Sequence, residues 1–83
     1  MSQVFSYRPE TPPDVTDAVL YAVTKGGTYL NQSGAKFLIG RGDVKLNGQV
    51  SRDIAEVLSE GTYRIGVLDE EYHLQIGYDR IEG

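Results

Sequence analysis

An 83-residue chain without cysteine has room for one small domain, and it excludes a disulfide framework or a thiolate metal site. Its net charge of -4 is unevenly distributed, because residues 25–52 carry a net charge of +4 and the remainder carries -8. No apolar run approaches the ~18 residues that span a bilayer, and the first residues lack the basic start and apolar middle of a signal peptide. We therefore expect a soluble, cytoplasmic protein that has no membrane partner.

Residues 1–13 are expected to form a flexible N-terminal arm. They show no apolar periodicity, and Pro9, Pro12 and Pro13 cannot donate backbone hydrogen bonds to a helix or a sheet. The folded domain is then expected over residues 14–80.

A first helix is predicted over residues 14–25. Asp14 can cap its first free amides, Asp17 adds negative charge to its first turn, and Gly26-Gly27 stops it. Five apolar residues recur at helical spacing and predict one buried stripe: Val15, Ala18, Val19, Ala22 and Val23.

A second, shorter helix is predicted over residues 33–41, with Ser33 as its N-cap. Ala35, Leu38 and Ile39 form its expected buried face. Phe37 lies off that stripe, so the ring either packs on a neighbouring element or is exposed.

A short strand at residues 44–46 leads into Asn47-Gly48, the dipeptide most typical of a two-residue hairpin turn. Such a turn places Val50 on the face of Lys45. Residues 52–60 read either as a short helix or as an extended loop pinned by Ile54, Val57 and Leu58.

The last third predicts a β-hairpin, joined at residues 69–71. Apolar side chains alternate with polar ones along both strands and fall on one face: Tyr63, Ile65, Val67, Tyr72, Leu74, Ile76 and Tyr78. The predicted class is therefore α+β, with two short helices packed on a small, mainly antiparallel sheet that ends in a C-terminal hairpin.

Catalytic constellations are poorly represented in this chain. His73 is its single histidine and there is no cysteine, so neither a Ser-His-Asp nor a Cys-His site is well founded. We expect a protein that is not an enzyme and that needs no cofactor or metal.

The basic segment is the strongest candidate for binding. Lys25, Lys36, Arg41, Lys45 and Arg52 fit a surface that contacts phosphates, and a helix N-terminus at Ser33 adds backbone amides suited to the same ligand. Asn47 is placed to shape the turn and to reach sugar or base edges. The alternative is a solvated polar rim around a small core.

The segment from Asn31 to Val50 resembles the RNA-binding module named after ribosomal protein S-four, also called the alpha-L motif. The matching residues are Ser33, Ala35, Leu38, Ile39, Gly42, Val44, Leu46, Asn47 and Gly48, followed by Gly61. Family members usually place arginines where this chain has Gly34 and Lys36. The resemblance implies binding to structured RNA, tRNA or rRNA, and the last hairpin looks similar to the C-terminal domain of bacterial tyrosyl-tRNA synthetases.

The main alternative function is protein interaction. A domain of the same fold that lost RNA binding would use its acidic remainder to contact a basic partner, including a nucleic-acid-binding protein whose ligand it mimics. The chain is compatible with a stand-alone protein and with one domain of a larger, synthetase-like protein.

Overall fold

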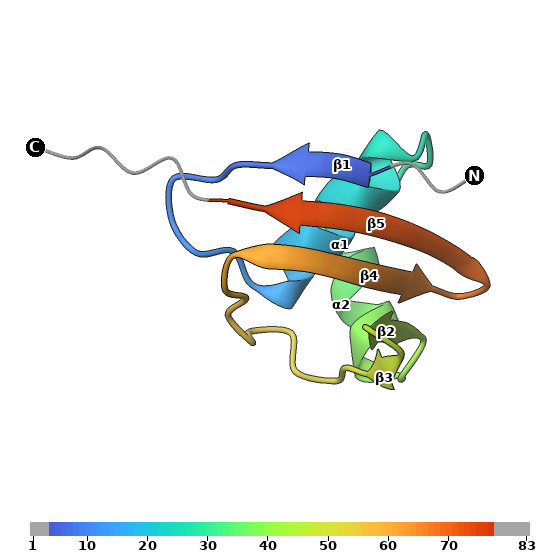
Figure 1. The fold of residues 1–83 in the computed structure, drawn as a ribbon. Helices are drawn as coiled ribbons and strands as arrows, with labels where there is room; N and C mark the ends of the chain where they lie inside the picture. The colour runs from blue at the N-terminus through green and yellow to red at the C-terminus, as the bar shows by residue number, and fades with distance from the viewer. Residues whose placement is uncertain (1–3, 78–83) are drawn as a thin grey trace, which may run out of the picture.

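The computed structural model describes residues 4–77 of the chain. Its elements in chain order are β1 (Val4–Tyr7), α1 (Val15–Lys25), α2 (Gln32–Gly40), β2 (Val44–Leu46), β3 (Gln49–Val50), β4 (Gly61–Val67) and β5 (Glu70–Ile76). The strands form one five-stranded sheet in the order β1-β5-β4-β2-β3, in which β1 and β5 are parallel and the other pairs are antiparallel. Both helices lie on the same side of this sheet (Figure 1). The predicted α+β class is confirmed.

Helix α1 begins and ends where the sequence predicts. The carboxylate of Asp14 accepts a hydrogen bond of 2.8 Å from the amide of Asp17, and Gly26 is the C-cap. The predicted apolar stripe is buried against the sheet, and all five of its residues are at most 3% exposed: Val15, Ala18, Val19, Ala22 and Val23.

Helix α2 begins earlier than predicted, and Ser33 is not its N-cap. Asn31 takes that position, because its side-chain oxygen accepts a hydrogen bond of 2.8 Å from the amide of Gly34. A Cβ at Gly34 would lie 2.9 Å from the side chain of Leu30, so the glycine lets Leu30 pack closely against the first turn. This packing favours the earlier start.

The expected flexible arm contains strand β1, which is a correction to the sequence analysis. Phe5 and Tyr7 face the helices, and the ring of Tyr7 stacks on that of Tyr21 with 4.3 Å between centroids. The Tyr21 hydroxyl also donates to the carbonyl of Ser6 at 2.6 Å. The prolines lie after this strand, so they do not interrupt its pairing with β5.

The Asn47-Gly48 turn forms as predicted. Both residues have positive φ, 52° and 87°, and the pairing of Lys45 with Val50 identifies a strict two-residue hairpin. Positive φ at both positions defines a type I′ turn, which Asn-Gly adopts readily.

Residues 51–60 form a loop without a helix, the second of the two predicted alternatives. Of the three expected anchors only Leu58 is buried, at 4% exposure, whereas Ile54 is 37% exposed and Val57 is 65% exposed. Backbone hydrogen bonds replace the other two anchors, since the amide of Val15 donates to the carbonyl of Glu56 and that of Leu58 to the carbonyl of Pro13.

The C-terminal hairpin is confirmed, with its apolar residues on the helix side of the sheet. Ile65, Val67, Leu74 and Ile76 are buried. The turn is Leu68-Asp69 rather than residues 69–71, because Val67 pairs with Glu70 and leaves two residues between the strands. Tyr78, assigned to the same face, lies outside the described residues.

Candidate nucleic-acid interface

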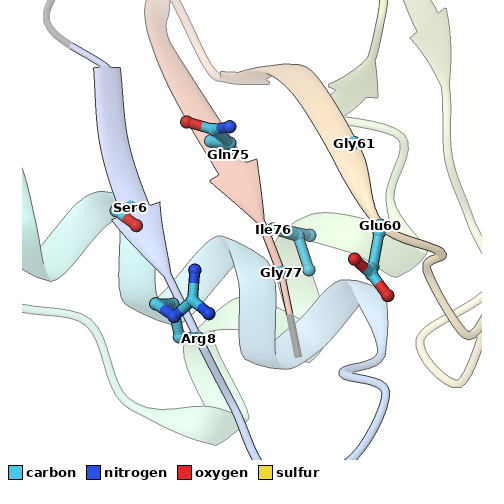
Figure 2. Close-up of a pocket in the computed structure, with 7 residues that line it drawn as sticks. All are labelled: Ser6, Arg8, Glu60, Gly61, Gln75, Ile76 and Gly77. Carbon is cyan, nitrogen blue, oxygen red and sulfur yellow. The ribbon is translucent and has the colours of Figure 1, made fainter. Parts of the chain in front are cut away.

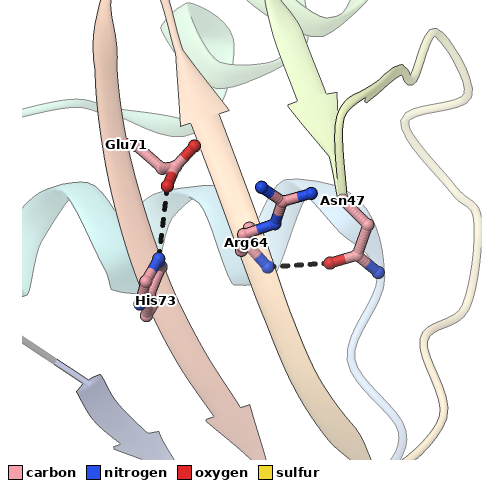
Figure 3. A network of polar contacts seen from close by, with 4 residues as sticks. All are labelled: Asn47, Arg64, Glu71 and His73. Atoms are coloured by element: carbon pink, nitrogen blue, oxygen red, sulfur yellow. Dashed lines mark hydrogen bonds and ion pairs between the residues drawn. The ribbon is translucent and has the colours of Figure 1, made fainter. Parts of the chain in front are cut away.

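The turn between β2 and β3 is tied to strand β4 by Asn47. Its backbone amide donates to the carbonyl of Arg64 at 2.8 Å. Its side-chain oxygen accepts from the backbone amide of Arg64 at 2.9 Å, the bond drawn in Figure 3. These two bonds use both backbone groups of Arg64. The predicted role of Asn47 in shaping the turn therefore has a specific mechanism, which is to fix the turn beside Arg64.

Arg64 is a candidate binding residue that the sequence analysis missed. It was counted with the acidic remainder, far from the basic segment in sequence. The antiparallel pairing of β2 with β4 places Gly66 opposite Lys45, so Arg64 lies diagonally from Lys45 on the same face. This face points away from the helices, and both basic side chains on it are exposed.

His73 lies directly across from Arg64 on this open face. Its Nε2 is 3.2 Å from a carboxylate oxygen of Glu71, as Figure 3 shows. The side chain of His73 is 24% exposed and that of Glu71 is 55% exposed. His73 therefore lies on the polar side of the hairpin.

The solvent face of α2 carries Lys36, Phe37 and Arg41, all of them exposed. Phe37 takes the exposed alternative, and the guanidinium of Arg41 lies over its ring, 5.3 Å from the centroid. Arg41 also forms an ion pair with Asp43, in which Nε lies 2.5 Å from Oδ2.

Arg52 lies between the helix and the sheet groups. Its guanidinium packs over Gly42, where a Cβ would approach within 2.9 Å, and Gly42 has a positive φ of 85°. The positive φ is what favours glycine here, because the end of the flexible Arg52 side chain could move away from a Cβ. The five exposed side chains around the β2–β3 end of the molecule are called the basic edge below: Lys36, Arg41, Lys45, Arg52 and Arg64.

Two of the predicted binding residues, Lys25 and Ser33, are not part of the basic edge. The ammonium of Lys25 lies 5.5 Å above the ring of Tyr21, which packs on β1 at the opposite edge of the sheet. Ser33 is an exposed residue inside the first turn of α2, and the Asn31 side chain already satisfies one amide of that terminus. The structure therefore does not bring Lys25 together with the other basic residues.

One group of acidic side chains lies away from the basic edge. The loop that carries Asp53, Glu56 and Glu60 is bonded to the start of α1, which carries Asp14 and Asp17. An isolated β-bridge pairs Val57 of this loop with Asp14, the residue that caps α1. A second group lies close to the basic edge: Asp69, Glu70 and Glu71 are at the β4–β5 turn, where the amide of Leu68 donates to the carbonyl of Asp43. The acidic group at the start of α1 still makes the charge uneven in space, which can orient a charged partner.

A polar cleft of about 400 Å³ lies at the far ends of β1 and β5, away from the basic edge. Figure 2 shows Arg8 and Glu60 on opposite sides of its mouth, with Ser6 and Gln75 on adjacent strands. Arg8 and Glu60 each already interact with other groups. The described residues that line the cleft include no histidine that could act as a base for Ser6.

Among residues 4–77, no group of three or more histidine or acidic side chains is close enough to hold a metal ion. In the same part of the chain, neither helix has the length and apolarity needed to cross a membrane. A scan against models of protein families finds no match, and a search of curated proteins finds no relative.

Proposed function

We propose that this protein is a non-catalytic RNA-binding module of the S-four type, acting in the cytoplasm on structured RNA such as tRNA or rRNA. The observation that carries the proposal is the basic edge. Five exposed cationic side chains surround one end of the molecule; of the acids beside them, Asp43 is paired with Arg41 and Glu71 lies 3.2 Å from His73. Lys and Arg side chains in this arrangement supply phosphate contacts.

The shape of the basic edge favours a folded RNA over a straight duplex. Lys36 and Arg41 lie on the helix side of the sheet, whereas Lys45 and Arg64 lie on its open side. Arg52 lies between these groups, against Gly42. A ligand that contacts both groups has to present phosphates in different directions, as a stem with a flanking strand or loop does.

The preference for RNA rests on the resemblance of residues 31–50 to the S-four motif. Phosphate contacts alone do not distinguish RNA from DNA. The residues of that resemblance occupy consistent structural roles here: Ala35 and Ile39 are buried in α2, Val44 is buried in β2, and Asn47-Gly48 forms the turn.

The test is a fluorescence-anisotropy titration of the protein with tRNA and with a labelled rRNA hairpin, from low to physiological salt. We expect salt-sensitive binding, with a slope of log Kd against log salt that falls by about one unit for each phosphate contact removed. The variant Lys36→Ala/Lys45→Ala removes one charge on each side of the sheet and should weaken both RNAs.

Lys25→Ala is the matched control, because it removes a lysine of the same sequence segment that lies toward the other edge of the sheet. It should leave the affinity nearly unchanged. Equal losses for Lys25→Ala and for each single lysine variant would show general attraction to positive charge and would contradict the proposed surface. Absence of binding at low salt would end the RNA proposal.

Protein interaction is the second candidate, favoured by the acidic region formed where residues 53–60 join the start of α1. This candidate predicts that charge reversal at Asp17 and Glu56 abolishes capture of a basic partner. It also predicts no effect of Lys36→Ala/Lys45→Ala on that capture.

A further inference from the structure

The solvent face of α2 places an aromatic ring between cationic side chains. Phe37 is 64% exposed, and it lies opposite the buried Ala35 and Ile39. Lys36 precedes it, and Arg41 follows one helical turn later. An exposed apolar residue by itself is ordinary in a folded protein. The feature that needs explaining is the ring together with its charged neighbours.

Arg41 holds this ring in a defined arrangement. Its guanidinium lies over the ring, 5.3 Å from the centroid, at a distance typical of a cation–π contact. The same guanidinium is paired with Asp43, so it is restrained from two directions. A ring that is ordered before binding loses less conformational entropy when a ligand packs on it.

The surroundings of Phe37 leave space for a flat ligand. A Cβ at Gly40 would meet no heavy atom within 4 Å, so the helix surface beside the ring is open. The ammonium of Lys36, on the adjacent position, is free of any ion pair shorter than 4.0 Å to described residues. An aromatic ring can stack on a base, and a neighbouring guanidinium and ammonium can contact its phosphates.

We propose that Phe37, with Arg41 over it, is a stacking platform for one unpaired RNA base. The preferred ligand is then a structured RNA with a bulged or looped nucleotide next to a stem, and the basic edge contacts the phosphates of the stem. This inference rests on the proposed RNA-binding function and adds a ligand class to it. In a paired A-form stem the base faces are stacked on each other, so only an unpaired base can reach the ring.

The experiment compares two labelled RNA hairpins of the same stem, each closed by a non-nucleotide linker so that no loop base is present, one fully paired and one with a single bulged adenosine. Stacking of a base on an aromatic side chain predicts about 5- to 150-fold tighter binding of the bulged hairpin. Phe37→Leu keeps an apolar side chain without a ring, and it should reduce the affinity for the bulged hairpin to that for the paired one. Phe37→Tyr keeps the ring and should retain the preference.

Contact between the RNA and residue 37 can be measured by tryptophan fluorescence, because the chain has no tryptophan of its own. Phe37→Trp provides one fluorophore at the proposed platform, and its emission should be quenched by the bulged hairpin far more than by the paired one. Val57→Trp is the matched control, since Val57 is 65% exposed on the loop that joins the start of α1. Equal urea midpoints of all variants exclude unfolding as the cause.

The outcomes separate this inference from the function on which it rests. Salt-sensitive binding of both hairpins with equal affinity, unchanged by Phe37→Leu, would overturn the platform and leave the RNA-binding module intact. Equal weakening of both hairpins by Phe37→Leu would also overturn it, because the ring would then contact RNA without selecting an unpaired base. Failure of both hairpins to bind at low salt would overturn both proposals.

Discussion

Substitution of Asn47 by alanine should destabilise the domain, and it tests how the turn is joined to the sheet. Asn47 has a φ of 52°, and its side-chain oxygen accepts the amide of Arg64 at 2.9 Å. Alanine loses this acceptor and enters the left-handed region at a cost that asparagine bears more easily. The lost hydrogen bond and the unfavourable backbone conformation therefore both lower the free energy of unfolding.

The size of the effect follows from these terms. Loss of one side-chain hydrogen bond costs about 0.5–1.5 kcal/mol, and alanine in the left-handed region costs about 1 kcal/mol. The expected loss in the free energy of unfolding is therefore about 2 kcal/mol. A domain of this size has a total stability of roughly 4–12 kcal/mol, so the loss should be easily measured.

Urea denaturation followed by circular dichroism gives the free energies, and two further variants separate the terms. Asn47→Gly keeps access to positive φ and removes the acceptor, so it should lose about 1 kcal/mol. Asn47→Asp keeps both an acceptor and tolerance of the left-handed region, so it should stay within about 0.5 kcal/mol of the original chain.

The order Asp, Gly, Ala in decreasing stability is the specific expectation. A stability of Asn47→Ala equal to that of the original chain would refute the reasoning. Equal losses for Asn47→Asp and Asn47→Ala would refute the role of the side-chain oxygen, because the aspartate variant retains an acceptor at that place.

Three further predictions concern the core, the helix end and the response to alkaline pH. Ile39→Ala should lower the free energy of unfolding by about 2–5 kcal/mol, because this side chain is fully buried; a loss below about 1 kcal/mol in urea would contradict the packing. Gly26→Ala should cost about 1–3 kcal/mol, since a Cβ there collides with the ring of Tyr72; an unchanged urea midpoint would mean that the ring moves freely. Burial raises the pKa of Tyr7 above its ordinary value of 10.0, and the negative charge of Asp17 adds to this effect. The folded state therefore keeps this proton more strongly than the unfolded state, so stability should fall as pH rises above 10.0. Urea midpoints measured up to about pH 11 should fall less steeply for Tyr7→Phe, and equal slopes would contradict the assignment.

Local patterns in the sequence predicted the elements whose signals are contained within a few residues. The stripe from Val15 to Val23 gave α1, and Asn47-Gly48 gave the turn between β2 and β3. Where two nearby residues carry the same signal, the sequence cannot choose between them, as at the N-cap of α2. Asn31 and Ser33 are both good N-caps, and only the packing of Leu30 against Gly34 distinguishes them.

The N-terminal strand was missed because its signal is not local. Residues 4–7 lack an adjacent turn signal such as Asn47-Gly48, and their partner, β5, is nearly the whole chain away. The stacking of Tyr7 on Tyr21 and the hydrogen bond from Tyr21 to Ser6 hold the segment on the domain. Neither contact can be read from spacing along the chain.

Some residues of the candidate site could be predicted from the sequence, and others only from the structure. Lys36, Arg41, Lys45 and Arg52 were found because they are concentrated in one segment, and the structure keeps them around one end of the sheet. Lys25 belongs to the same segment, yet α1 carries it toward β1. Arg64 joins the basic residues through strand pairing.

The sequence by itself determined the α+β class, the buried faces of the helices and of the final hairpin, and the concentration of positive charge over residues 25–52. These properties depend on periodicity and composition, which act over a few residues. Only the tertiary structure decided that Arg64 replaces Lys25 at the basic edge, that Arg52 packs on Gly42, and that Phe37 is exposed beneath Arg41. The physical reason is strand register and helix placement, which bring distant residues together and are fixed by packing of the whole core.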